Sequence, residues 1–286
     1  RVPALSLENA IIQEMQMNSG NVGGYFICNQ NKISKSLDFH NSKFMDNLYL
    51  QGKELFGPID LRDCRIAGGL VMEGSTCRSK INMDRTVIEK NLNMNAGIFE
   101  ELNMRSGIIN GNFIMDGSQF NGAVVITSSK IEGDLFIRNT AKLQDFNFVN
   151  GLVGGNFEIK SSEITGNMQM GSLAVQQNFF IYDHALLQGI VNLPTARVRG
   201  DFTFENSLAL SYINMEGMEI GLTLFIKSCD IKYNINLSFI RVGESIDLSD
   251  SKFIEVNLTA ANIQSELRLG RKNNTSWYPS GYLNLR

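Results

Sequence analysis

The chain holds four cysteines and two histidines, the residue types that most often act as nucleophiles, general bases or metal ligands. The cysteines lie at apolar positions of separate segments, so we expect core packing rather than disulfides or a metal cage. They are Cys28, Cys64, Cys77 and Cys229. We expect His40 to be exposed at a corner and His184 to be packed into the wall of the fold, with no nucleophile beside it. The sequence therefore predicts no catalytic residue, no cofactor and no metal site.

Asparagine is the other polar residue with regular spacing. Seven asparagines recur at intervals of about 22 residues or twice that: Asn82, Asn103, Asn147, Asn192, Asn214, Asn236 and Asn257. Stacked amides on neighbouring strands can hydrogen-bond to one another, as in cross-β assemblies. We therefore expect a structural ladder of asparagine side chains. Binding of a polysaccharide or another polar polymer is the alternative.

These residues belong to an eleven-residue unit that repeats along nearly the whole chain, most clearly from Leu224 to Leu269. Positions one, three and eight are apolar, and position six is mostly small. Apolar residues two apart face one side of a strand, so each unit predicts two short strands and two bends. A fixed short period of this kind marks a repeat architecture.

Glycine recurs at position ten of the unit, where we expect corners with φ above zero. These glycines are Gly57, Gly68, Gly122, Gly133, Gly155, Gly166 and Gly200. Few residues remain outside the two strands and two bends of each unit. The sequence therefore indicates a chain of many short strands joined by tight corners.

Outward position two distinguishes alternate units. In one set it is nearly always Asn, Asp or Gln. In the other set it is largely apolar or aromatic, and seven of its members form what we call the aromatic column: Ile27, Tyr49, Val71, Ile114, Phe136, Phe180 and Phe225. Two sets that differ so much place alternate units on opposite sides, so a full turn has about 22 residues.

The sequence thus predicts an all-β chain, folded as a right-handed, four-sided parallel β-solenoid of roughly twelve turns. We expect the solenoid to span residues 1–269 as one domain. Residues 270–286 interrupt the pattern with a loop that contains Trp277, and then begin a further strand. We expect the loop to pack over the coil, with a contact role as the alternative.

The unit resembles the repeats of bacterial pentapeptide-repeat proteins, with a sixth residue at alternate corners. It looks more like a bacterial β-solenoid family with eleven-residue repeats, in which a coil is followed by an insert with Trp and then Leu-x-Leu-Arg. Here those segments are Leu267 to Gly270, Trp277, and Leu283 to Arg286. Members are often labelled membrane-associated oxidoreductases, but this sequence has no nucleotide-binding fingerprint and no apolar stretch long enough to span a membrane.

The net charge of −3, with 19% charged residues, argues against strong attraction to nucleic acid. A contiguous apolar strip on a surface usually marks a contact site, so we expect the aromatic column to bind a protein partner or a second copy. The predicted function is a non-enzymatic interaction scaffold, with a cytoplasmic location slightly favoured. Two alternatives stay open: a duplex-DNA mimic that binds topoisomerase, as some pentapeptide-repeat proteins do, and the non-catalytic part of a larger enzyme.

Overall fold

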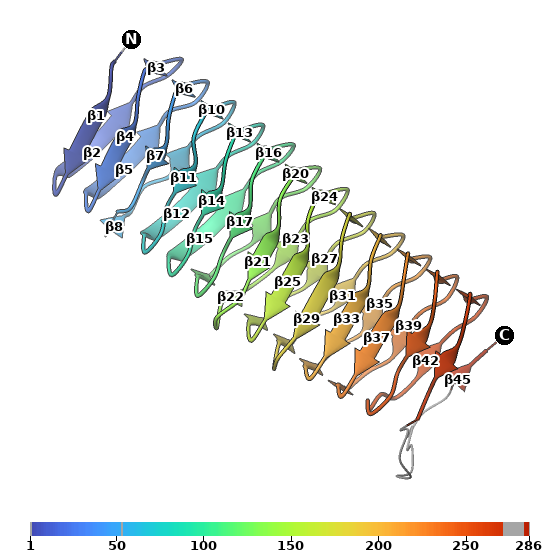
Figure 1. Ribbon diagram of the computed structural model, residues 1–286. Helices are drawn as coiled ribbons and strands as arrows, with labels where there is room; N and C mark the ends of the chain where they lie inside the picture. Colours follow the sequence, from blue (N-terminus) through green and yellow to red (C-terminus); the bar gives the residue numbers. More distant parts are fainter. Residues whose placement is uncertain (1, 53, 271–282, 286) are drawn as a thin grey trace. The chain divides into compact units, whose positions relative to one another are not determined.

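The computed structural model describes residues 2–52, 54–270 and 283–285, which form strands and tight corners without any helix (Figure 1). The strands build a parallel β-solenoid of about twelve turns with about 22 residues per turn, which confirms the fold class predicted from the sequence. The right-handed sense of the coil stays a prediction. The chain divides into two compact units, unit 1 at Arg1–Gln144 and unit 2 at Asp145–Arg286. The loop with Trp277, which we expected to pack over the coil, with a contact role as the alternative, lies outside the described residues.

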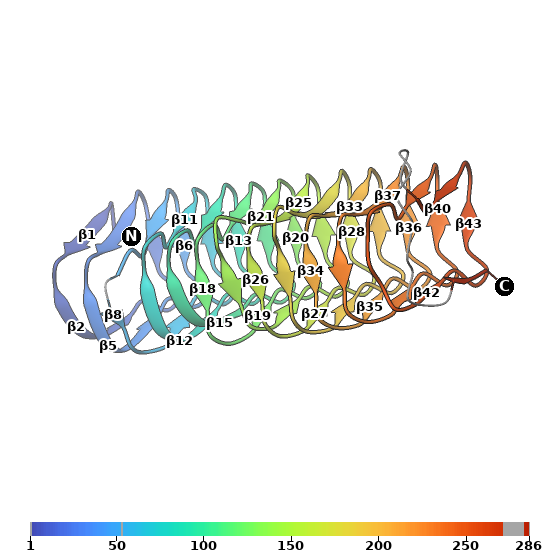
Figure 2. The same cartoon turned by 90° about the horizontal axis from the view of Figure 1, so that it is seen from below.

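Each turn passes through four columns of parallel strands, which we number 1 to 4 in chain order. Columns 1 and 4 form separate sheets, and columns 2 and 3 belong to a common sheet. The common sheet arises because four strands of unit 1 run through columns 2 and 3 without a break. The four columns in both units (Figure 2) are the four sides expected from the repeat.

In unit 1, column 1 holds β1 (Leu5–Glu8), β4 (Phe26–Asn29), β7 (Leu48–Tyr49), β11 (Leu70–Val71), β14 (Leu92–Asn93), β17 (Phe113–Ile114) and β21 (Leu135–Ile137). Columns 2 and 3 hold β2 (Ile11–Gln16), β5 (Lys32–Asp38), β8 (Glu54–Leu55), β9 (Ile59–Asp60), β12 (Thr76–Asn82), β15 (Ile98–Asn103), β18 (Gln119–Phe120), β19 (Val124–Val125) and β22 (Lys142–Leu143). Column 4 holds β3 (Asn21–Val22), β6 (Lys43–Phe44), β10 (Arg65–Ile66), β13 (Val87–Ile88), β16 (Ile108–Ile109) and β20 (Lys130–Ile131).

In unit 2, column 1 holds β25 (Phe157–Lys160), β29 (Phe179–Tyr182), β33 (Phe202–Glu205), β37 (Leu224–Lys227), β41 (Ile246–Asp247) and β44 (Leu267–Arg268). Column 2 holds β26 (Glu163–Ile164), β30 (Leu186–Leu187), β34 (Leu208–Ala209) and β38 (Asp230–Ile231). Column 3 holds β23 (Phe146–Asn147), β27 (Met168–Gln169), β31 (Val191–Asn192), β35 (Ile213–Asn214), β39 (Ile235–Asn236), β42 (Val256–Asn257) and β45 (Leu283–Asn284). Column 4 holds β24 (Leu152–Val153), β28 (Ala174–Val175), β32 (Arg197–Val198), β36 (Glu219–Ile220), β40 (Arg241–Val242) and β43 (Asn262–Ile263).

Residues at equivalent positions of neighbouring turns are register partners. Leu48 pairs with Leu70, 22 residues later. The backbone N–H of Leu48 donates to the carbonyl of Gly69 at 2.9 Å, and that of Leu50 donates to Val71 at 2.8 Å. Short strands suffice because each one bonds to the turns on both sides, which satisfies its backbone polar groups.

Apolar side chains at positions one, three and eight fill the interior of each unit. In unit 1, Phe26 packs edge-on against Phe39 and Phe44, with ring centroids 5.2 and 5.8 Å away. In unit 2, the rings of Phe157 and Phe179 stack with centroids 4.3 Å apart. All five rings are fully buried, so aromatic contacts within and between turns contribute much of the packing.

The small residue at position six bonds as well as packs. The Ser75 hydroxyl donates to the carbonyl of Leu50 at 2.8 Å, which lies 25 residues earlier in the preceding turn. The Cys64 thiol makes the same contact with the carbonyl of Phe39 at 2.9 Å. Asn31 is larger, but its amide also donates to a carbonyl of the preceding turn at 2.7 Å. In these turns position six thus holds a polar donor that is buried with a partner, whereas in others it holds a buried apolar residue, as at Leu173, Met218 and Ile240.

Left-handed backbone conformations occur at position five of the unit, not at position ten. Asn41 and Asp63, with φ of +57° and +59°, are typical, and short polar residues tolerate this region best after glycine. The predicted position-ten glycines Gly57, Gly68, Gly122, Gly133 and Gly200 do not have positive φ. They lie where adjacent turns approach closely: a Cβ on Gly57 would be 1.3 Å from the carbonyl oxygen of Lys35. Our expectation about their φ was wrong. Glycine is needed at these positions because it has no side chain to clash with the adjacent turn.

His184 is exposed at a corner with a φ of +67°, so the prediction that it packs into the wall was wrong. Twelve residues instead of eleven separate Phe179 from Val191. The corner absorbs the extra residue, because Asp183 and His184 both adopt left-handed conformations. Ala185, which is 1% exposed, takes the inward place that the repeat assigned to His184.

Candidate interaction face

The aromatic column lies on the outer surface of column 1, and its members follow one another in register within each unit. In unit 1 the order of register partners is Ile27, Tyr49, Val71, Asn93, Ile114 and Phe136. In unit 2 the order is Glu158, Phe180, Thr203, Phe225 and Asp247. The seven residues of the aromatic column are all half-buried, and none belongs to the core. Their role as a contact surface stays a prediction.

Polar groups cover part of the column in unit 1. The amide of Asn47 donates to the hydroxyl of Tyr49 at 2.9 Å. The guanidinium of Arg138 lies over the Phe136 ring, 3.8 Å from its centroid, and also pairs with Asp116 at 2.7 Å. The Phe136 ring therefore offers a partner less apolar surface than the sequence alone implies.

In unit 2 the outer surface of column 1 is hollowed into a groove of about 500 Å³. Its lining consists of Asn156, Glu158, Phe180, Tyr182, Thr203, Glu205, Phe225 and Lys227. Thr203 is the register partner of both Phe180 and Phe225, one strand layer to either side. Because threonine is much smaller than phenylalanine, the groove opens between the two rings. The rings lie two layers apart, which is roughly 10 Å.

Charged and hydroxyl groups frame the two rings. The hydroxyl of Tyr182 donates to Glu158, and the Tyr182 ring lies edge-on to Phe180 with centroids 6.2 Å apart. The ammonium of Lys227 lies 5.8 Å from the centroid of Phe225. Carboxylate and ammonium groups thus surround an apolar floor, which is the composition of a binding surface with an apolar centre and a polar rim.

The asparagine column lies on the outside of column 3, and in unit 2 its amides bond in series. Asn192, Asn214, Asn236 and Asn257 each donate to the residue one turn earlier, and the first acceptor is Gln169. The four bonds measure 2.8 to 3.1 Å. Asn147 precedes this series as the register partner of Gln169.

In unit 1 the same column has no such series among the hydrogen bonds of the described residues. Asn82 and Asn103 are register partners, but the amide of Asn103 donates to Glu101 at 2.5 Å, and the side-chain oxygen of Asn103 is buried without a hydrogen bond. The oxygen of Asn82 accepts from the backbone N–H of Asp84 at 3.1 Å. The amide ladder is therefore a feature of unit 2.

The cysteines do not supply a nucleophile. All four are buried and free. Burial raises the pKa of the Cys64 and Cys229 thiols to about 12, and it also raises the pKa of Cys28 and Cys77. The thiolate is the reactive form of cysteine, so these thiols are protonated and inert at neutral pH.

The sequence reasoning missed a cluster of ionisable side chains in unit 1, formed by Asp38, His40 and Asp60. Arg62 donates to both carboxylate oxygens of Asp60 at 2.9 Å. Partial burial raises the pKa of Asp60, but the hydrogen bonds and charge of Arg62 outweigh burial, so the net pKa is lowered. The signal was present in the repeat, since Asp38 and Asp60 occupy the same position of consecutive turns and His40 follows Asp38 by two residues.

Comparison of the chain with protein-family models, with curated proteins and with solved structures finds no match. Within the described residues, no helix is long and apolar enough to cross a membrane.

Proposed function

We propose that the chain is a non-enzymatic binding module that uses the outer surface of column 1 to hold a protein partner or a second copy. The observation that carries the proposal is the pair of half-buried rings, Phe180 and Phe225, on either side of Thr203. Aromatic side chains bury a large area with few rotatable bonds, so they anchor many protein interfaces. We further propose that the chain is related to the solenoids of pentapeptide-repeat proteins, whose repeats its eleven-residue unit resembles.

The shape of the groove specifies what the partner presents. The gap at Thr203 suits one apolar side chain inserted between the two rings. Glu158, Glu205 and Lys227 at the rim supply both acceptors and donors for polar groups that flank this anchor. The partner is thus a protein segment with an apolar side chain between polar neighbours.

The duplex-mimic alternative has less support. A mimic of the phosphate backbone requires uncovered rows of acidic side chains. Acidic groups of unit 1 pair with basic groups one turn away, as in Lys32 with Glu54 and Arg85 with Asp63, both at 2.7 Å. Pairing of this kind neutralises the surface rather than making it uniformly acidic.

The proposal is tested with a double variant, Phe180→Ser and Phe225→Ser. Sedimentation of a concentration series reports self-association, and a photo-crosslinking residue at Thr203 reports partners in extracts of the native host. We expect crosslinks at Thr203, and at least tenfold weaker association for the double variant, because the loss of two buried rings removes the anchors of the interface. Thermal melting should change little, since both rings lie outside the core.

The matched control replaces two exposed apolar residues of the same unit that lie off column 1, Leu210→Ser and Leu222→Ser. Association and crosslinking should survive in this control. Equal association of the double variant and the parent chain, or equal loss in the control, would contradict the assignment of the face. Phe136→Ser should have a smaller effect, because Arg138 already covers that ring.

A further inference from the structure

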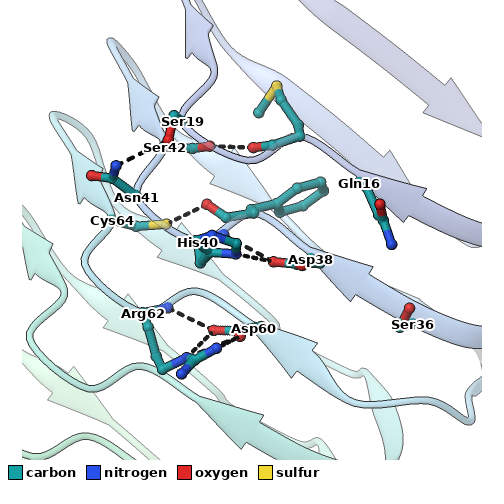
Figure 3. A network of polar contacts seen from close by, with 12 residues as sticks. Gln16, Ser19, Ser36, Asp38, His40, Asn41, Ser42, Asp60, Arg62 and Cys64 are labelled. Atoms are coloured by element: carbon teal, nitrogen blue, oxygen red, sulfur yellow. Dashed lines mark hydrogen bonds and ion pairs between the residues drawn. The ribbon is translucent and has the colours of Figure 1, made fainter.

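Three side chains with metal-binding atoms converge on the outside of column 3 in unit 1 (Figure 3). Asp38 ends β5, Asp60 ends β9, and the two are register partners in adjacent turns. His40 follows β5 by two residues. One carboxylate oxygen of each aspartate and a ring nitrogen of His40 all lie within 4.8 Å of one another. All three residues are half-buried, so solvent and ions reach the cluster.

The two stacked carboxylates occupy a position that other turns fill with amides. In unit 2 the equivalent side chains are Asn or Gln, and they donate to one another. Ionised carboxylates have no proton to donate, so Asp38 and Asp60 repel where amides would attract. Arg62 is the positive partner of Asp60. A cation bound by both carboxylates at this position replaces their mutual repulsion with attraction to a shared ion.

We propose that Asp38, His40 and Asp60 bind a divalent transition-metal ion, which joins two consecutive turns of the solenoid. Two carboxylates and one imidazole form a mixed oxygen and nitrogen donor set. Imidazole favours zinc and its neighbours in the first transition row over magnesium or calcium, which prefer oxygen ligands alone. Zn²⁺ is therefore the appropriate probe.

The geometry needs only local adjustment to admit the ion. His40 Nδ1 now lies 2.7 Å from Asp38 Oδ1, in a hydrogen bond. Zinc bonds of about 2.0–2.1 Å place two ligands roughly 3 Å apart, so this pair opens by only a few tenths of an ångström. The Asp60 carboxylate moves closer by side-chain rotation. Water completes the coordination on the solvent side.

Two neighbours support the donors. With its amide oriented to donate, Asn18 Nδ2 lies 3.1 Å from Asp38 Oδ1, and a turn of this amide presents its oxygen as a fourth ligand. The guanidinium of Arg62 donates to both oxygens of Asp60, and the backbone N–H of Arg62 donates to Asp60 Oδ1 at 3.0 Å. A metal ion replaces one of these hydrogen bonds when Asp60 binds it. The positive charge of Arg62 lowers the affinity for a cation.

The test uses the untagged full chain, because a histidine tag would bind the same metals. The chain has only two histidines, so proton NMR resolves the imidazole signals of His40 and His184. On titration with ZnCl₂ we expect the His40 signals to move and to saturate at one equivalent. The His184 signals, from an exposed corner of unit 2, should stay in place. The same concentration of MgCl₂ should move neither.

Asp60→Asn keeps the shape of the side chain but replaces one carboxylate with an amide, and should weaken Zn²⁺ binding at least tenfold. His40→Gln should do the same by calorimetry, whereas the matched controls His184→Gln and Asp63→Asn should bind as the parent chain does. Thermal melting without metal shows whether each variant folds. Equal shifts of both histidines, saturation only at millimolar Zn²⁺, or unchanged binding by folded Asp60→Asn would each overturn the site.

Discussion

Asn214 Nδ2 donates a hydrogen bond of 2.9 Å to Asn192 Oδ1, and the two asparagines are register partners 22 residues apart. Asn236 in turn donates to Asn214 at 3.0 Å, so the amide of Asn214 acts as donor and acceptor at once. Hydrogen bonds in series polarise one another, and the series from Gln169 to Asn257 ties consecutive turns of unit 2 together. The relationship makes Asn214 a structural residue although its side chain is partly exposed.

Asn214→Ala should destabilise unit 2 by about 1–3 kcal/mol, because it removes two amide hydrogen bonds at once. The effect should be local, since a solenoid is stabilised by contacts between neighbouring turns. Hydrogen exchange should quicken in β31, β35 and β39 more than elsewhere. Asn262→Ala, at an exposed position of β43, is the control and should change little. Similar losses for both variants would argue against a stabilising ladder.

Phe157→Asp should unfold several turns of unit 2. Phe157 is fully buried and stacks on Phe179, so the substitution places an unpaired charge in a dry interior. Phe180→Asp is the matched control, because Phe180 faces outward in the adjacent turn and is half-buried. Circular dichroism melting should show a large loss for the first variant and a small one for the second. Unchanged melting of Phe157→Asp would mean that the ring is not inside.

Gly217 and Gly221 offer a comparison between two uses of glycine four residues apart. A Cβ on Gly221 would lie 2.1 Å from the carbonyl oxygen of Arg199, whereas a Cβ on Gly217, which has a φ of +63°, would meet only Thr195 Cγ2 at 3.6 Å, an ordinary contact. Gly221→Ala should therefore cost at least about 2 kcal/mol through a backbone clash between turns. Gly217→Asn should cost well under 1 kcal/mol, because asparagine tolerates left-handed corners. Chemical denaturation decides between these outcomes, and the opposite ranking would refute the close approach.

The buried thiols predict a loss of stability in alkali. Burial raises the pKa of Cys64 and Cys229 from 9.0 to about 12 in the folded chain. Below about pH 9 the thiols are protonated in both states, so the full stability is present. Between pH 9 and 12 the unfolded chain loses protons that the folded chain retains, and stability falls by up to about 1.4 kcal/mol per thiol for each pH unit.

Urea unfolding at pH 8 and pH 10.5 measures this loss. The variant Cys64→Ser with Cys229→Ser serves as reference, because serine keeps the hydrogen bond to the preceding turn and does not ionise in this range. The stability of the parent chain should decline more steeply with pH than that of the variant. Parallel declines would show that other groups, such as tyrosine and lysine, account for the whole effect.

The turn length and the four columns could be predicted because they follow from the hydrophobic period together with the outward residues at position two. Alternation within each unit sets the inward face, and the contrast between Asn214 and Phe225 at equivalent positions shows that successive units lie on different sides. Conformation at the corners could not be predicted in the same way. Glycine permits either a positive φ, as at Gly217, or a close approach of two backbone segments, as at Gly221. The sequence alone does not distinguish these two roles.

The Asp38, His40 and Asp60 cluster was missed for a related reason. Position two was interpreted by polarity, and Asp was grouped with Asn and Gln as one outward class. Their chemistry diverges only when neighbours one turn away are considered, because two amides attract and two carboxylates repel. His40 joins the cluster through the path of the corner, which the repeat does not specify.

The hydrogen bond from position six to a carbonyl 25 residues earlier has a consequence for how the chain is made. A ribosome delivers the polypeptide in order, so the acceptor of each such bond exists before its donor emerges. Every new turn can thus hydrogen-bond to the exposed strands of the preceding turn, which has already folded. The loop that it must close is always about one turn long. Synthesis itself can then direct assembly, with each freshly folded turn as the template for the one that follows.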